Sequence, residues 1–248
     1  MYPLVSIITP AYKAEKYIMD CIRSVQNQTY ENWEMIIVND KSPDSTEELI
    51  KEAAEMDGRI RLISLSQNQG VVNARNTAIQ AAKGQFIAFL DSDDVWFPEK
   101  LKKQIVSMEE NKWPISYTSY DLMDDHGEAL HKTVNAPAST TYKELLKGSN
   151  IGCLTVVVNK AMVGEFLMPK IHHEDYATWL MLLKRGFVAY GIPESLACYR
   201  KATGSLSGNK KKAAQWQWKV LREHEGLSLL KSSYYFLHYT INGIKKSL

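Results

Sequence analysis

Hydrophobic and polar positions alternate in two different ways over the first hundred residues. Four short apolar runs, rich in β-branched residues, predict buried strands at residues 4–9, 33–38, 60–65 and 85–90. Between these runs, apolar side chains recur at three- and four-residue steps and predict helices at residues 17–25, 49–56 and 71–82. Strands that alternate with helices through short connections predict an α/β fold, with a Rossmann-like, mostly parallel sheet flanked by helices.

The pattern changes after Trp96. Pro98 begins another helix, residues 115–120 predict a strand, and the polar stretch 121–149 predicts a loop or a small hairpin. Further along, the chain predicts a strand, a helix and two more strands, at residues 153–159, 174–186, 187–192 and 196–200. From Ala213 onward, apolar residues spaced along one face predict one or two amphipathic helices.

The charge of the chain is distributed unevenly. The whole chain has a formal net charge of +2, but residues 200–248 hold ten Lys or Arg and only two Glu. This tail therefore carries a net charge of +8, which leaves −6 for residues 1–199. A basic, amphipathic tail predicts an anionic partner, either a membrane surface or a phosphorylated lipid, and a solvated lysine-rich helix is the alternative. No nucleic-acid partner is expected.

The cysteines and the N-terminus predict the compartment. Cys21, Cys153 and Cys198 are widely spaced and odd in number, which fits neither a disulfide framework nor a zinc site and predicts reduced thiols. The first residues are cut by Pro3 and Pro10 and do not form a signal peptide. No uncharged run approaches the roughly 20 residues of a membrane-spanning helix. The protein is therefore expected to be cytoplasmic, either soluble or peripheral on the inner face of the cell membrane.

Polar residues gather where the predicted strands end. Residues 9–15 follow the first strand, residues 39–45 follow the second, and the sequence DSDD at residues 91–94 follows the fourth. Ligands of parallel sheets bind beyond the carboxyl ends of the strands, so chemistry is expected there. Alternate carboxylates at a strand end can hold Mg²⁺ or Mn²⁺, which take oxygen ligands and accept phosphate oxygens as further ligands. An exposed acidic turn that caps the helix at Pro98 is the alternative.

Ordered motifs over most of residues 3–205 carry a family resemblance. They are VSIITPAYKAEKYI, SVQNQTYENWEMIIVNDKSPDST, NQGVVNARNTAI, GQFIAFLDSDDVW and EDYATWLMLLKRG, followed by YR. In this order and spacing they resemble the family 2 glycosyltransferases. The resemblance implies the GT-A fold, a UDP-sugar donor, Mn²⁺ or Mg²⁺, and transfer with inversion, of the type found in bacterial surface-polysaccharide synthesis. It divides the chain into a nucleotide-sugar half (1–97), an acceptor half (98–205) and a helical extension (206–248).

The resemblance also implies a nucleotide site. Its expected members are Pro10, Tyr12, Glu15, Asp40, Arg75, Asn76 and Asp91. Asp40 would read the base, because a carboxylate accepts a hydrogen bond from the ring N–H of uracil, although the family usually has a second acid where this chain has Asn39. Arg75 and Asn76, near the start of a helix, suit a diphosphate. Simple packing of Tyr12 and a surface ion pair of Arg75 are the alternatives.

The same resemblance assigns the catalytic groups. Asp93 and Asp91 become metal ligands, and Asp91 also contacts ribose. Asp175 becomes the general base, with Glu174 as its neighbour, since an inverting transfer needs one carboxylate to take the proton of the acceptor hydroxyl. The alternative is that this acidic pair only complements a helix dipole.

Several further side chains stay open at this point. Arg200 and Trp179 are candidates for acceptor or diphosphate contacts, although core packing is the preferred interpretation of Trp179. Asp94 either caps or orients the next turn, and the histidines at 172–173 are expected to be structural, with a metal ligand or an acceptor contact as the alternative. The Gly- and Ser-containing segment after Arg200 could close over the diphosphate or be a plain linker.

Three other functions compete with glycosyl transfer. A haloacid-dehalogenase-like phosphatase would use Asp91 as nucleophile and Asp93 as acid, but that family places its aspartates after the first strand. A nucleotidyltransferase would need a Gly-rich basic loop after the first strand, which this chain lacks. A non-catalytic binding module would not need Asp93 and Asp175. The preferred hypothesis is a metal-dependent transfer of a sugar from a UDP-sugar to a hydroxyl of a saccharide acceptor, one that the basic tail suggests is lipid-linked.

Overall fold

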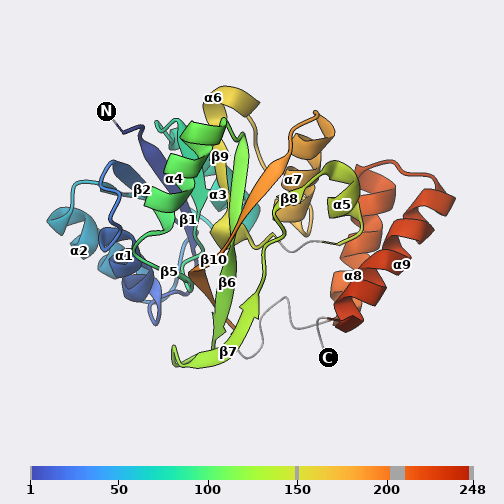
Figure 1. Cartoon of the computed structure of the whole chain (residues 1–248). Helices are drawn as coiled ribbons and strands as arrows, with labels where there is room; N and C mark the ends of the chain where they lie inside the picture. The colour runs from blue at the N-terminus through green and yellow to red at the C-terminus, as the bar shows by residue number, and fades with distance from the viewer. Residues whose placement is uncertain (1, 149–150, 202–209, 246–248) are drawn as a thin grey trace.

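The computed structural model describes residues 2–148, 151–201 and 210–245. Within these residues one ten-stranded sheet runs through the protein, and helices cover both of its faces (Figure 1). The strand order is β3-β2-β1-β4-β9-β6-β10-β5, with β7 beside β6 and β8 beside β10. The strands are β1 (Val5–Ala11), β2 (Trp33–Asn39), β3 (Ile60–Ser64), β4 (Phe86–Phe89), β5 (Val95–Trp96), β6 (Ile115–Met123), β7 (Ala129–Val134), β8 (Ser139–Thr140), β9 (Val157–Asn159) and β10 (Ala189–Arg200). The helices are α1 (Ile18–Gln26), α2 (Thr46–Met56), α3 (Val71–Ala81), α4 (Lys100–Asn111), α5 (Tyr142–Leu146), α6 (Lys160–Val163), α7 (Glu174–Lys184), α8 (Lys210–Lys219) and α9 (Leu229–Lys245).

The first four strands form the parallel part of the sheet. β1 pairs in parallel with β2 and β4, and β2 pairs in parallel with β3. Because successive side chains point to opposite faces, Ile7 packs into the core cluster of α1, α2 and α4, whereas Ile8 packs into the cluster of α3 and α7. Both clusters exclude water from the strands, which explains their continuous apolar runs. The predicted alternation of strands and helices, and hence the α/β fold class, is confirmed.

The rest of the sheet adds antiparallel strands to the predicted, mostly parallel sheet. β9 lies antiparallel between β4 and β6, so those two strands run in the same direction on either side of it, and β6 pairs in parallel with β10. The predicted strand at residues 153–159 is too long. Cys153–Thr155 forms a 3-10 turn, η1, in which the Thr155 hydroxyl donates to the Gly152 carbonyl at 2.7 Å. This local bond competes with strand pairing, so only Val157–Asn159 joins the sheet.

The two strands predicted at residues 187–192 and 196–200 are one continuous strand, β10. Its parallel pairing with β6 shifts register between Ile192 and Ser195, and again before Cys198. Pro193 lies inside the first shift, and because proline has no N–H the strand bulges there without ending. In the polar stretch 121–149, β6 extends to Met123 and forms a hairpin with β7, so the hairpin alternative is confirmed and the short helix α5 is added.

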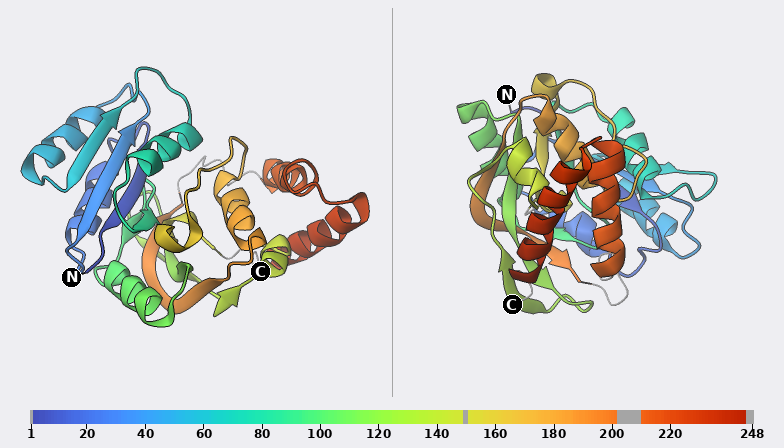
Figure 2. Two further views of the ribbon diagram at one scale, coloured as in Figure 1. Left: turned by 90° about the horizontal axis from the view of Figure 1, so that it is seen from above. Right: turned by 90° about the vertical axis from the view of Figure 1, so that its right-hand side faces the viewer.

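The C-terminal part forms two helices, as predicted, joined through a π-helical turn, η3 (Val220–His224). They pack side by side at the end of the molecule farthest from α2 (Figures 1 and 2). Val220 and Leu221 of η3 are buried in the same core cluster as α3 and α7. Among the helices of the described residues, none is both long and apolar enough to cross a membrane. The predicted boundary at 205–206 and the Gly- and Ser-containing segment lie outside the described residues.

Candidate functional site

A cleft of about 830 Å³ opens at the edge of the sheet where β1, β2 and β4 end. It is lined by Pro10, Ala11, Tyr12, Asp40, residues 68–75, residues 91–93, residues 170–172 and Glu174. The predicted strand-end residues therefore meet the start of α7, which lies far along the chain. Ligand sites of α/β sheets are expected at this edge.

Asp40 fixes one wall of the cleft. Its side chain is only 3% exposed, and its two carboxylate oxygens accept hydrogen bonds from the backbone N–H groups of Gln69 and Gly70, both at 2.7 Å. Gly70 has a φ of 86°, a left-handed conformation that favours glycine, and it directly precedes α3. Asp40 thereby sets the position of the α3 N-terminus. Each carboxylate oxygen keeps a further lone pair for a ligand.

The loop after β1 carries two residues of the predicted nucleotide site, Tyr12 and Glu15, and they lie in different places. Tyr12 lines the cleft and is 46% exposed, and the ammonium of Lys13 lies 5.4 Å from its ring centroid. Glu15 does not line the cleft. Its carboxylate accepts a hydrogen bond at 3.0 Å from the backbone N–H of Ser45, the residue before α2. Glu15 is thus used to hold the start of α2, and the structure does not bring it to the predicted nucleotide pocket.

Arg75 joins the two sides of the cleft. It is 5% exposed, and it donates from Nη2 to Asp91 Oδ1 at 2.6 Å and from Nη1 to Glu174 Oε1. Asp91 follows β4 and Glu174 begins α7, so Arg75 joins the two sides of the cleft, and Glu174 lies 99 positions beyond Arg75 in the sequence. Burial raises the pKa of Glu174, and the Arg75 charge opposes that rise. Arg75 Nε is buried and has no hydrogen-bond partner among the described residues.

Asp93 carries negative charge that its surroundings do not fully compensate. Burial and the neighbouring charge of Asp91 raise the pKa of Asp93 to about 6. A cation bound between these two carboxylates would relieve their repulsion, so the residues present fit a divalent metal. In the part of the chain that the structure describes, no group of three or more His, Cys, Asp or Glu could hold a metal by itself. For a divalent ion at this place, the protein would supply one or two carboxylates, and other oxygens would complete the ligand set, as is usual for Mg²⁺.

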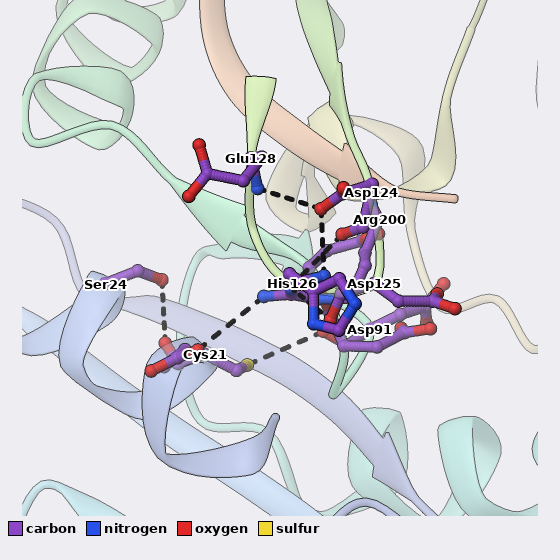
Figure 3. Close-up of polar contacts among 11 residues, drawn as sticks. Cys21, Ser24, Asp91, Asp124, Asp125, His126, Glu128 and Arg200 are labelled. Atoms are coloured by element: carbon purple, nitrogen blue, oxygen red, sulfur yellow. Dashed lines mark hydrogen bonds and ion pairs between the residues drawn. The ribbon is translucent and has the colours of Figure 1, made fainter. Parts of the chain in front are cut away.

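Asp94 and Arg200 fix the position of the acidic loop, which consists of residues 91–93 after β4. Asp94 is 1% exposed, and its Oδ1 accepts a hydrogen bond from the backbone N–H of Arg200 at 2.8 Å. Arg200 Nε in turn donates to the Asp93 carbonyl at 2.8 Å, and Nη1 lies 3.4 Å from the carbonyl oxygens of Asp124 and Asp125. Figure 3 shows Arg200 between the β6–β7 turn and the loop that carries Asp91. Arg200 is 3% exposed and does not line the cleft, so its contacts position the acidic loop.

Asp175 lies next to Glu174 in the first turn of α7. It shares its surroundings with the acidic loop: Asp91 and Asp175 both contribute to raising the pKa of Cys153, after burial. On the same side, the pKa of Tyr120 is raised to about 12 by burial first and then by nearby groups that include Asp94 and Asp175. Asp175 does not line the cleft as Glu174 does, and its Oδ1 accepts a hydrogen bond from the backbone N–H of Tyr176 at 2.7 Å, in the first turn of α7.

Two other predicted contact residues are not in the cleft. The Asn76 side-chain amide exchanges two hydrogen bonds with the Met168 backbone, at 2.9 and 2.8 Å. One residue beyond Arg75, it points about 100° away around the helix. Trp179 is 2% exposed and packs edge-on against Phe89, with ring centroids 5.4 Å apart. It lies one turn deeper in α7, where the helix has entered the core, so core packing is the observed arrangement.

Helix α8 packs against the start of α7, and the sequence did not reveal this contact. Trp216 stacks on His172 with centroids 4.4 Å apart and an interplanar angle of 18°, and it meets His173 edge-on. Gln217 Nε2 donates to the Tyr176 hydroxyl at 2.9 Å. These contacts lie on both sides of Glu174 and Asp175 in the sequence. Only contact information could have found them, since Trp216 reads as one apolar position of an amphipathic helix.

Comparison with known proteins gives consistent results. The family model described as Glycosyl transferase family 2 matches residues 6–157. The chain is 46% identical over 247 residues to the putative teichuronic acid biosynthesis glycosyltransferase TuaG of Bacillus subtilis (strain 168), covering 99% of this chain and 98% of the relative. It is 42% identical over 245 residues to UDP-Glc:alpha-D-GlcNAc-diphosphoundecaprenol beta-1,3-glucosyltransferase WfgD of Escherichia coli, covering 98% and 94%.

Solved structures with low sequence identity share the fold. The structure of S. aureus TarS 1-349 in complex with UDP-GlcNAc matches with a TM-score of 0.69 at 18% identity, over 94% of this chain and 70% of TarS. The mannosyltransferase PcManGT from Pyrobaculum calidifontis, in complex with GDP-Man and Mn²⁺, matches with a TM-score of 0.71 at 15% identity, over 95% and 70%. At these identities the similarity shows the fold alone.

Proposed function

Because the chain belongs to the family 2 glycosyltransferases, we propose that it transfers a sugar, with inversion, from a UDP-sugar to a hydroxyl of a lipid-linked saccharide in bacterial surface-polysaccharide synthesis. One observation carries this proposal: a single cleft is lined by Asp40, by the acidic loop at residues 91–93 and by Glu174 at the start of α7. The names of the relatives support the substrates, since one uses UDP-Glc and an undecaprenol-linked acceptor.

The donor would lie along the first wall of the cleft. The uracil ring would pack on Tyr12, and its N–H would donate to the remaining lone pairs of Asp40. The amides at the start of α3, which Asp40 positions, and the Arg75 guanidinium would face the diphosphate. Asp91 would accept a hydrogen bond from ribose. Asp93 and Asp91 would hold Mn²⁺ or Mg²⁺, which supplies positive charge that stabilises the departing diphosphate.

Asp175 is assigned as the general base in preference to Glu174. Glu174 is already paired with the buried Arg75, whereas the ion pairs found among the described residues do not include Asp175. In the reaction, the acceptor oxygen attacks the anomeric carbon as Asp175 takes its proton. The bond from that carbon to the phosphate oxygen breaks, and its electron pair leaves with UDP. One displacement inverts the anomeric carbon and needs no covalent intermediate.

The acceptor would approach from the wall of the cleft where Glu174 begins α7, since Asp175 is the next residue of that helix. An acceptor linked to a polyprenyl diphosphate remains in a membrane, so the enzyme would work at the cytoplasmic face of the cell membrane. The sugar itself depends on pocket contacts, and UDP-Glc and UDP-GlcNAc, named for the relative and for the TarS complex, are the first donors to test.

The experiment compares Asp175→Asn with Glu174→Gln, using UDP-sugar donors and a saccharide-diphospholipid acceptor. Loss of the base is expected to lower kcat by a factor on the order of 10² to 10⁴, while UDP binding stays the same. Glu174→Gln, which weakens an ion pair only, is expected to lose less. Full-speed transfer by Asp175→Asn would overturn the base assignment. Release of inorganic phosphate from simple esters, without release of UDP, would favour the phosphatase alternative.

A further inference from the structure

Helix α9 presents a continuous apolar stripe to solvent. Twelve large apolar side chains are exposed among the described residues, and five of them lie on this helix. The stripe consists of Leu230 (85% exposed), Tyr234 (51%), Leu237 (59%) and Ile241 (41%), with Leu229 (61%) beside it. Steps of four, three and four residues place the stripe on one side of the helix. A clustered apolar surface of this kind marks an interaction site, whereas single exposed apolar residues do not.

The opposite side of α9 is already occupied. Ser232 is fully buried, Phe236 packs edge-on against Trp218 of α8 with centroids 5.4 Å apart, and Asn242 Nδ2 donates to the Lys147 carbonyl at 3.0 Å. These contacts fix the rotation of the helix, so the apolar stripe faces outward and has no place in the core. Seen from the right-hand side of Figure 1, α8 and α9 lie in front of the rest of the chain (Figure 2).

The charges of the two helices identify the kind of partner. Helices α8 and α9 contain six lysines and neither Asp nor Glu. Of the two acids between them, Glu225 is buried and paired with Lys184, and Glu223 is exposed, so the lysines outnumber the exposed acid. A second copy of this chain would bring another basic surface against the first, which costs electrostatic energy. A bilayer that contains anionic lipid offers both an apolar interior and negative headgroups.

We propose that α9 lies in the surface of an anionic lipid bilayer, with Leu230, Leu237 and Ile241 inserted at the boundary of the acyl chains. Tyr234 then sits at the headgroup level, where aromatic side chains with a polar end are favoured. Exposed lysines of the two helices, Lys219 of α8 and Lys231 of α9, contact lipid phosphates. An apolar face combined with basic residues is typical of helices that lie in the membrane plane.

Such docking explains how the enzyme reaches its acceptor, and this step rests on the proposed function. Helix α8 packs on α9 through Trp218 and Phe236, and it also contacts His172 and Tyr176 around the start of α7. The docked surface is therefore connected by direct contacts to the helix that carries Asp175. A lipid-linked saccharide in the same bilayer would be presented beside the cleft.

The test is sedimentation of the full chain with vesicles of phosphatidylcholine, with and without phosphatidylglycerol. Wild type is expected to bind the vesicles that contain phosphatidylglycerol, and salt is expected to weaken the binding. The double variant Leu230→Glu/Leu237→Glu is expected to bind at least about tenfold more weakly. Met56→Glu is the matched control, because Met56 is 88% exposed but lies on α2, at the other end of the molecule. It is expected to bind as wild type does.

Equal binding by the double variant, or no binding by wild type, would overturn the proposal. It would also be overturned if the double variant changed a dimer into a monomer, since the stripe would then cover a second copy. Thermal unfolding checks that both variants fold. Transfer to a short, water-soluble acceptor analogue is measured separately: the double variant should keep this activity, so that failure of docking and failure of the proposed reaction give different results.

Discussion

The two walls of the cleft are built by different kinds of contact. The first wall consists of strand ends: Asp40 follows β2 directly, Asp91 follows β4 after Leu90, and both strands are buried on both faces. The second wall, around Glu174, depends on side chains from elsewhere in the chain, namely Arg75, Trp216 and Gln217. The difference teaches that the chemical groups of this site are encoded locally, whereas their position across the cleft is encoded by distant contacts.

Asp93→Asn acts on the chemistry of the first wall and should have the largest effect. It removes the proposed metal ligand, so the rate of UDP release in the presence of Mn²⁺ should fall by a factor on the order of 10² or more. The fold should survive, since Asp93 ends no strand and its carboxylate is a source of repulsion. Glu48→Gln, an exposed change on α2, is the control and should keep full activity. Unchanged turnover by Asp93→Asn would refute the assignment.

Arg75→Met breaks the contact between the two walls. It leaves the Asp91 and Glu174 carboxylates without their shared partner, and breaking a buried ion pair in this way should cost about 3 kcal/mol of unfolding free energy. Urea unfolding measures the loss. Arg61→Met is the control, because Arg61 pairs with Glu34 but is 37% exposed, and a pair of that kind contributes about 1 kcal/mol or less. Equal losses in the two variants would show that Arg75 does not join the walls.

The raised pKa of Asp93 predicts opposite pH dependence with and without metal. The folded-state pKa of about 6 is above the unfolded value of roughly 3.9, so the folded protein binds the proton more tightly. Without metal, the stability should therefore fall as the pH rises from about 4 to 6, by about 1 to 2 kcal/mol because the carboxylate is partly exposed.

A divalent ion needs the ionised carboxylate, so stabilisation by Mn²⁺ should instead weaken as the pH falls through about 6. Thermal unfolding across this pH range, with and without Mn²⁺, measures both trends. The Asp93→Asn variant should lose both of them. A wild-type curve that coincides with that of the variant at every pH would contradict the prediction.

Trp216→Ala removes only the contact of α8 with the start of α7, in the second wall, and should have the smallest effect. Without the stack on His172, the start of α7 is less well positioned, and kcat should fall about three- to tenfold while UDP binding stays unchanged. Trp216→Phe should restore most of the rate because an aromatic ring can still stack. Trp218→Ala, from the same helix but facing α9, is the control. A fall in UDP affinity with constant kcat would indicate a role at the other wall.

The sequence predicted the local features of the fold and of the site. The runs before Asp40 and Asp91 were identified as buried strands, and the helix that starts at Glu174 was expected, because these features follow from periodicity within a few residues. The continuous β10 was missed because Pro193 resembles a break in the chain, while its pairing with β6 carries the strand past that residue. The antiparallel direction of β9 was not predicted, because it is set by tertiary pairing.

The contacts that position the side chains of the site join residues far apart in the chain, so they leave no local pattern in the sequence. Arg75 meets Glu174 across 99 positions, and the Arg200 amide meets Asp94 across 106. From the sequence, Arg200 was therefore expected near the substrate, whereas in the structure its Nε donates a hydrogen bond to the backbone carbonyl of Asp93 in the acidic loop. Glu15, Asn76 and Trp179 were assigned by their position in motifs, but their side chains are occupied by contacts with Ser45, Met168 and Phe89.

The most direct test of the account is calorimetric titration of UDP into wild type, Asp93→Asn and Asp175→Asn, with and without Mn²⁺. The account predicts that Mn²⁺ strengthens UDP binding in wild type and in Asp175→Asn, which nevertheless does not transfer sugar at an appreciable rate, and that Mn²⁺ has little effect in Asp93→Asn. Equal strengthening by Mn²⁺ in all three proteins would contradict it.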